Sequence, residues 1–248
     1  MMKKNTIAFA AVLLVSMVSL SSCGGTSYKT VKRLQKLEEG VSNPVTKEEL
    51  QQAIEKYDQR AMDLVAAQAQ EGIWYKILGT RYLDERMFGK AMEAFQNALL
   101  YYPDNANLYY YVAICAAYQA NAQLDFEAQG QSFAHEKMMN YLKVSEDAYL
   151  RALSINPKYY RAMYGIGVLY TFQLDESEKA IPYLEKFLET QTKDTNAMFV
   201  LARAYYSTYQ FQKAIDLYDK IIELNVNPDK TADARTNKNI VLDAQSSH

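Results

Sequence analysis

The sequence offers few side chains that could carry out acid–base or metal chemistry. Its 248 residues include only two histidines, His135 and His248. His135 opens the stretch His-Glu-Lys-Met-Met, which begins like a zinc-protease helix but lacks the second histidine that such a helix needs to hold the metal. A catalytic or metal site built on imidazole is therefore not expected.

The other reactive residue types give equally weak signals. Cys115 lies in an apolar helical stretch with no histidine nearby in the sequence, which favours a buried, inert thiol. The cluster of Asp175, Glu176 and Glu178 is more typical of a solvated turn than of a calcium loop. The sequence has no glycine-rich phosphate loop either. We therefore expect a protein that is not an enzyme and that has no catalytic residue, cofactor or metal.

Cys23 is the one residue with a predicted covalent chemistry. Lys3 and Lys4 precede an uncharged apolar run at residues 7–20, which has the length of a signal-peptide core and is too short to span a bilayer. The Leu-Ser-Ser-Cys stretch that ends at Cys23 resembles the bacterial lipobox. That resemblance implies cleavage after a signal peptide at residues 1–22 and lipid attachment to Cys23. The alternative is an ordinary secretory signal with an incidental cysteine.

The next segments are predicted to link this anchor to a helical domain. Residues 23–45 contain flexible glycines and four basic residues, and we interpret them as a tether. Thr46 and Glu49 then fit a capping box, and apolar residues from Leu50 to Leu64 recur at spacings of four and three. We predict an N-terminal capping helix at residues 46–71, ended by Glu71 and Gly72.

One helix ending occurs twice in the chain. An aromatic residue, an alanine three positions on and a proline five further on appear as Phe95, Ala98 and Pro103, and again as Tyr149, Ala152 and Pro157. The tripeptide Lys-Ala-Ile also recurs, at residues 179–181 and 213–215. Recurrence of this kind is typical of an array of helical repeats.

The first of these endings completes a longer pattern that resembles the tetratricopeptide repeat, with signature residues Tyr75, Leu78, Gly79, Tyr82, Ala91, Phe95, Ala98 and Pro103. The resemblance implies an all-α superhelical solenoid of antiparallel helix pairs with a capping helix at both ends. We assign four repeats to residues 72–105, 106–159, 160–194 and 195–228, and a C-terminal capping helix to residues 229–248. The third repeat has Thr192 where the proline belongs, and Pro228 comes two residues late in the fourth.

The second repeat is about 20 residues longer than the others, because its Tyr149, Ala152 and Pro157 come late. We predict that both helices of this repeat run on as a hairpin with its tip at residues 129–132.

The candidate binding residues follow from the family resemblance. In tetratricopeptide-repeat proteins, positions 2, 5, 9, 12 and 13 of each first helix line the concave side where ligands bind. Here those positions hold Lys76, Tyr110, Tyr118, Tyr164, Phe172, Phe199 and Tyr206. The resemblance thus implies an aromatic groove for a partner. Alternatively, these rings pack against neighbouring helices, since the chain has 21 tyrosines.

Two functions from different classes fit these features. The first is a lipid-anchored scaffold of the cell envelope that binds a protein or peptide partner, on the outer membrane facing the periplasm in preference to the inner membrane. The second is an accessory protein of a solute uptake system that binds a small apolar molecule. The formal net charge of −2 does not favour a nucleic acid partner.

Overall fold

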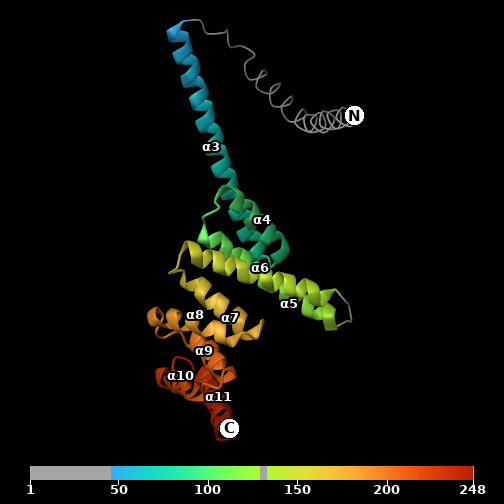
Figure 1. Cartoon of the computed structure of the whole chain (residues 1–248), viewed down its shortest axis with the longest axis vertical. Coiled ribbons are helices and arrows are strands. Elements are labelled where there is room, and N and C mark those ends of the chain that lie inside the picture. Colours follow the sequence, from blue (N-terminus) through green and yellow to red (C-terminus); the bar gives the residue numbers. More distant parts are fainter. Residues whose placement is uncertain (1–45, 129–132, 248) are drawn as a thin grey trace, which may run out of the picture. The chain divides into compact units, whose positions relative to one another are not determined.

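The computed structural model describes residues 46–128 and 133–247. The predicted signal peptide, Cys23, the tether and the tip of the predicted hairpin lie outside these residues. Within them the fold is all α-helical, as predicted. The helices are α3 (Lys47–Asp84), α4 (Phe88–Tyr101), α5 (Ala106–Ala128), α6 (Ala134–Ile155), α7 (Tyr160–Phe172), α8 (Ser177–Thr190), α9 (Thr195–Ser207), α10 (Phe211–Leu224) and α11 (Pro228–Ser246). Figure 1 shows them in sequence colours.

The chain divides into two compact units, Met1–Leu64 and Val65–His248. The described part of the first unit is the start of α3, where the predicted capping box is confirmed. Thr46 Oγ1 accepts a hydrogen bond from the amide of Glu49, and Glu49 Oε2 accepts one from the amide of Thr46, both at 3.1 Å.

The predicted end of this helix at Glu71 and Gly72 is wrong, because α3 is 38 residues long and ends only at Asp84. Gly72 is buried within the helix, where an added Cβ would lie 2.7 Å from the side chains of Tyr101 and Tyr102. The glycine therefore serves close packing rather than helix termination. The Tyr102 hydroxyl fixes this contact by donating a hydrogen bond of 2.7 Å to the carbonyl of Ala69.

The second unit consists of helices that pack on their neighbours in chain order, and α5, α7 and α9 also contact one another in succession. This is the arrangement of a solenoid of helix pairs. Small residues allow the helices to approach each other closely. A Cβ added to Gly79 would lie 2.7 Å from the ring of Phe95, and Ala180 and Ala214 are fully buried.

The turn between the two helices of a pair follows a similar pattern in three repeats, although that of the third repeat is one residue longer. Arg86, Asp175 and Tyr209 each adopt a positive φ, of 58°, 52° and 59°. The next amide in each turn then donates to a carbonyl in the last turn of the first helix. These bonds run from Met87 to Tyr82, from Glu176 to Tyr170 and from Gln210 to Tyr205, all at 2.8 Å.

A lysine lies over a tyrosine ring across each of these turns. The ammonium-to-centroid distances are 5.6 Å for Lys90 and Tyr82, 5.5 Å for Lys179 and Tyr170, and 5.0 Å for Lys213 and Tyr205. This contact gives the recurring Lys-Ala pair a structural role. The lysine packs on a tyrosine of the first helix, and the small alanine beside it allows the two helices to approach closely.

The second helix pair is longer than the two pairs that follow it. Helices α5 and α6 have 23 and 22 residues, whereas α7 to α10 have 13 or 14. They lie side by side and extend past the shorter helices (Figure 1). The buried hydroxyl of Ser145 joins them by donating a hydrogen bond of 2.9 Å to the carbonyl of Ala113. The extra residues of this repeat therefore lengthen both helices.

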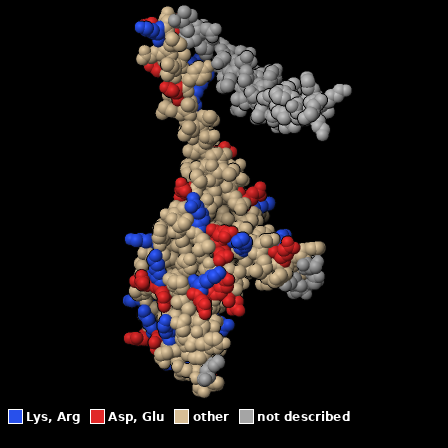
Figure 2. Space-filling view, viewed as in Figure 1, with Lys and Arg blue, Asp and Glu red and all other residues tan. Residues whose placement is uncertain are grey.

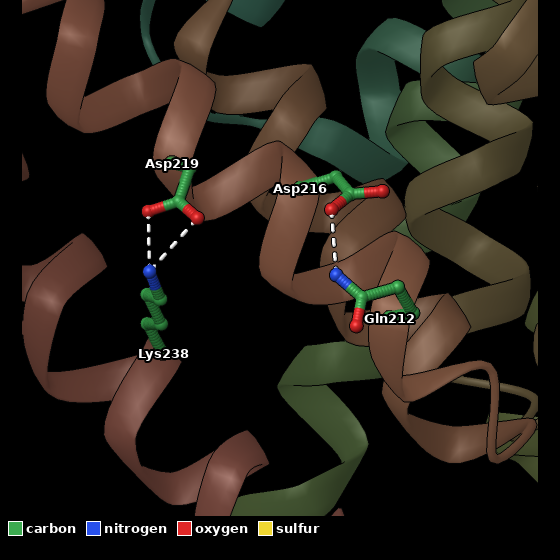
Figure 3. Close-up of polar contacts among 4 residues, drawn as sticks. All are labelled: Gln212, Asp216, Asp219 and Lys238. Carbon is green, nitrogen blue, oxygen red and sulfur yellow. Dashed lines mark hydrogen bonds and ion pairs between the residues drawn. The ribbon is translucent and has the colours of Figure 1, made fainter.

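Helix α11 covers α10 at the end of the unit. Its first turn is capped by Asn227, whose side chain accepts hydrogen bonds from the amides of Asp229 and Lys230, and Pro228 occupies the first helical turn. Val241 is buried against the core, and Lys238 binds both carboxylate oxygens of Asp219 at 2.6 and 2.8 Å (Figure 3).

Candidate functional site

A cavity of about 300 Å³ lies between α5, α6 and α7. Four tyrosines line it: Tyr110 and Tyr118 from α5, Tyr149 from α6 and Tyr164 from α7. Arg161 lies at the same cavity, and Ile114, Ala117, Val168 and Leu169 supply apolar surface between the rings. We call this site the tyrosine pocket.

The rings of the tyrosine pocket are held by other rings. Tyr110 packs edge-on against Tyr159 with centroids 5.4 Å apart and lies 6.2 Å from Tyr149. Tyr118 stacks on Phe88 of α4 at 4.2 Å while remaining 50% exposed. These contacts fix the positions of the rings, so that the pocket is formed before any ligand arrives.

The hydroxyls of Tyr110, Tyr149 and Tyr164 are neutral donors at physiological pH. Burial raises the pKa of Tyr110, Tyr149 and Tyr164, since the phenolate is poorly solvated there. The guanidinium of Arg161 opposes this shift at Tyr110. Among the described residues, none of the four hydroxyls has a hydrogen-bond partner in the protein. The pocket therefore combines four available O–H donors with one cation, which suits a ligand rich in carbonyl or carboxylate oxygens.

Gln173 also lines the pocket. Its Nε2 donates a hydrogen bond of 2.9 Å to Oδ1 of Asn121 and so ties the C-terminal end of α7 to the extended part of α5. Its Oε1 is buried and has no partner among the described residues.

A second hollow of about 250 Å³ is lined by residues of α7, α9, α10 and α11. Phe199 lies there with its centroid 5.9 Å from Tyr218, and the Arg203 guanidinium lies 5.5 Å over the ring of Tyr206. Phe172, which is 58% exposed, completes its aromatic lining.

The structure thus divides the predicted groove residues between two places. Tyr110, Tyr118 and Tyr164 meet in the tyrosine pocket, and Phe172, Phe199 and Tyr206 meet in the second hollow. Lys76 lines neither. That these residues bind a partner stays a prediction.

Arg161 and Tyr149 are among the residues of the tyrosine pocket that were not predicted from the sequence. Arg161 occupies position 2 of the third repeat, so the family pattern already contained the signal for it. Tyr149 lies on a second helix as a repeat-signature residue, and no sequence signal indicated that it also borders a cavity.

The alternative interpretation of the rings, as packing between helices, also holds in part. The three aromatic residues at position 5 each contact an aromatic residue of a second helix, at 6.2 Å for Tyr110 and Tyr149, 5.6 Å for Tyr164 and Phe187, and 5.9 Å for Phe199 and Tyr218. All three are half-buried. Each ring therefore packs on the protein with one part and borders a hollow with another.

The weak sequence candidates for chemistry remain weak in the structure. Cys115 is fully buried, as predicted, and burial raises the pKa of its thiol to about 12. Across residues 46–128 and 133–247, no group of three or more acidic, histidine or cysteine side chains could hold a metal ion. No helix in those ranges has the length and apolarity to cross a bilayer.

Comparison with known proteins agrees with the helical pattern. Residues 172–225 match the family described as tetratricopeptide repeat. A protein of Borreliella burgdorferi named as a TPR repeat-containing protein is 24% identical over 203 residues, which cover 80% of this chain and 84% of the relative.

Solved structures show the same fold at low sequence identity. YrrB, described as a TPR protein with an unusual peptide-binding site, is 17% identical with a TM-score of 0.57, over 75% of this chain and 83% of its own. A MamA fragment from Desulfovibrio magneticus is 16% identical with a TM-score of 0.51, over 72% of this chain and 97% of its own. None of these names denotes an enzyme. The chain thus has the fold of an α-helical tetratricopeptide-repeat solenoid, and residues 172–225 match the tetratricopeptide-repeat family.

Proposed function

We propose that this chain is a non-enzymatic scaffold of the bacterial cell envelope, anchored through a lipid on Cys23, that holds a peptide segment of a protein partner in the tyrosine pocket. The observation that carries the proposal is the meeting of four tyrosines and Arg161 at one cavity. A peptide backbone supplies the carbonyl acceptors that these donors need, and an acidic side chain suits the arginine. YrrB, which has a similar fold, is described as having a peptide-binding site.

The anchor is a separate part of the proposal and rests on the sequence. The basic start, the apolar run and the lipobox-like stretch stand in the order that lipid attachment requires. We place the protein on the outer membrane, facing the periplasm.

Cys23 has its own experiment. Mass spectrometry of the native N-terminus should find an acylated Cys23, and Cys23→Ser should release the chain from the membrane fraction. An unmodified N-terminus would refute the anchor without affecting the pocket.

Site-specific photocrosslinking in cells tests the pocket. A photoreactive amino acid in place of Tyr118, which is 50% exposed, should crosslink to one defined partner segment. The same group in place of Leu100, which is 77% exposed on α4 and lines neither hollow, is the control and should not capture that segment.

Two substitutions then separate binding from folding. In the crosslinking strain, Arg161→Glu should reduce capture at least about tenfold without changing the melting temperature, because Arg161 is exposed and its charge is reversed. Tyr164→Ala should also reduce capture. Its melting temperature should fall less than that of Phe95→Ala, since Phe95 is fully buried and its truncation should lower the free energy of unfolding by about 3–5 kcal/mol. A large melting shift in Tyr164→Ala with capture intact would mean that the ring only packs helices.

A small apolar molecule remains the second candidate ligand. The apolar surface of Ile114, Ala117, Val168 and Leu169 favours it, and the cavity lies at the lower end of the ligand-site range of roughly 300–1,000 Å³. A fluorescent naphthylamine probe distinguishes the two functions. Saturable probe binding that Val168→Glu abolishes, with no crosslinked peptide, would favour the small molecule.

A further inference from the structure

The outward side of α3 carries apolar side chains that the rest of its unit does not cover. Ile73, Trp74, Ile77 and Leu78 are 42, 63, 51 and 42% exposed. On a helix these four positions fall within about 140° of arc, on the side away from Gly72 and Gly79, which are buried. We call these four residues the α3 face. On the side that Figure 2 shows, the surface around the second half of α3 is largely uncharged.

The position of α3 in the array explains why this face is uncovered. Later first helices have a preceding pair to pack on, since α7 contacts α5 and α6, and α9 contacts α7 and α8. In the unit Val65–His248 no helix pair precedes α3. At the other end, α11 exposes mainly polar residues such as Asp229, Arg235 and Asn239. The apolar face thus lies where a further helix layer would pack.

The exposed area is large enough to take part in an interface. The uncovered parts of one tryptophan and three aliphatic side chains amount to an apolar patch on the order of 400 Å². Two such faces, together with the smaller side chains around them, approach the roughly 1,000 Å² at which specific interfaces begin.

We propose that the α3 face binds the α3 face of a second copy of this chain, with the two helices antiparallel about a two-fold axis. Gln70, Trp74, Ile77 and Arg81 recur at spacings of four, three and four, which is the seam pattern of two helices packed along their length. With the axis near residues 75 and 76, Trp74 lies opposite Ile77 of the second copy, and Gln70 lies opposite Arg81 of the second copy. The seam is apolar at its centre and hydrogen-bonding at both ends, so it is self-complementary.

Charge favours this occupant over the alternatives. Antiparallel pairing keeps the two Arg81 side chains about 16 Å apart along the helices, whereas parallel pairing would set them side by side. A membrane surface is a poorer match. Residues 65–84 carry two acidic and two basic side chains, without the excess of lysine and arginine typical of helices that lie on anionic lipid.

The experiment uses Trp74 as its reporter, because it is the one tryptophan in the sequence. The protein is the full chain carrying Cys23→Ser, which removes the predicted acylation site. In sedimentation velocity across a concentration series, the mass should rise from 28.4 kDa towards twice that value. Trp74 emission should shift to shorter wavelength, and iodide quenching should fall, over the same concentrations.

A matched pair of variants locates the contact. Ile77 and Ile240 are both 51% exposed, on α3 and α11 respectively. Ile77→Glu should raise the dissociation constant of the dimer at least about tenfold with an unchanged melting temperature. Ile240→Glu should dimerise like the parent chain.

A crosslinking arm tests the orientation. A mixture of the Gln70→Cys and Arg81→Cys chains, each otherwise Cys23→Ser, should form mixed disulfides in preference to those between like chains. A constant monomer mass with unchanged Trp74 emission would overturn the proposal, as would a dimer that survives Ile77→Glu. Binding of the chain to phosphatidylglycerol vesicles without dimerisation would also overturn it, in favour of a membrane surface.

Discussion

The hydroxyl of Tyr170 in α7 donates a hydrogen bond to Oε1 of Glu146 in α6, with 2.8 Å between the oxygens. Tyr205, which holds the same position in the next repeat, donates to Glu185 of α8. Each tyrosine therefore joins its own repeat to the one before it. In a solenoid, where contacts run only between neighbours, such bonds are a principal polar link along the array.

Removing one of these hydroxyls should weaken the array. Tyr170→Phe leaves the half-buried carboxylate of Glu146 without its donor and should lower the free energy of unfolding by about 1–1.5 kcal/mol in urea denaturation. Tyr82 is the matched control, since it holds the same position in the first repeat and its hydroxyl has no hydrogen-bond partner among the described residues. Tyr82→Phe should stay within about 0.5 kcal/mol of the parent chain. Equal losses in the two variants would contradict a role for the carboxylate.

Gly167 should not tolerate even a methyl group. An added Cβ would lie 2.6 Å from Cγ and Cδ2 of Leu184, which is fully buried and has no room to move. Gly167→Ala should therefore cost about 1–3 kcal/mol, although alanine favours a helix by about 1 kcal/mol. The control is Gly89→Ala in α4, whose Cβ would meet the flexible end of Gln119 at 2.9 Å. Thermal denaturation should show a loss for the first variant and little change for the second.

Tyr209 is the least suitable residue in the recurring left-handed turn. It adopts a φ of 59° with a bulky side chain that is 69% exposed. Asparagine accepts this conformation more readily, so Tyr209→Asn should raise the free energy of unfolding by about 0.5–1 kcal/mol. Tyr209→Phe keeps the ring that packs edge-on against Phe211 at 6.0 Å and should behave like the parent chain. A less stable asparagine variant would show that the ring contact outweighs the backbone strain.

Stability should fall in alkali. Burial raises the pKa of Tyr159 to about 12, above its unfolded value of 10.0, and raises those of Tyr110, Tyr164 and Tyr218 as well. A raised pKa means that the folded chain retains a proton that the unfolded chain releases. The stabilisation is therefore complete below about pH 10 and is lost as the pH rises towards 12.

Circular dichroism melts at increasing pH check this prediction. The melting temperature should decline above pH 10, and the decline should be shallower in Tyr159→Phe, which has one proton fewer to lose. A constant melting temperature to pH 11 would contradict it.

The sequence predicted the fold well because the repeat signature marks close helix packing directly. Gly79 belongs to the family signature and Ala180 and Ala214 to the recurring Lys-Ala-Ile tripeptide, and all three lie buried in the structure. The same reasoning failed at Gly72. Glycine can end a helix or can allow a neighbouring helix to pack closely. At Gly72 the second role is evident only from the positions of Tyr101 and Tyr102 in the structure.

The candidate site was less predictable, since it depends on contacts between distant residues. Tyr170 and Glu146 are 24 residues apart and Tyr205 and Glu185 are 20 apart, because Glu146 lies further from the end of its helix than Glu185 does. Sequence periodicity therefore cannot pair them. The family positions likewise suggested one continuous aromatic groove. Whether neighbouring rings share a cavity depends on side-chain packing, and Tyr164 and Phe199 border different hollows.

The unequal length of the helix pairs has a consequence for how the molecule opens. In a linear array each pair is stabilised mainly by its neighbours. Helices α5 and α6 are longer than the helices of the pairs that follow, and the buried bond from Ser145 to Ala113 joins them. Backbone amides near that bond should exchange with solvent deuterium most slowly, whereas those of α10 and α11 should exchange first. Unfolding would then proceed inward from the C-terminal pairs, and the walls of the tyrosine pocket in α5 and α6 would be among the last elements to lose their structure.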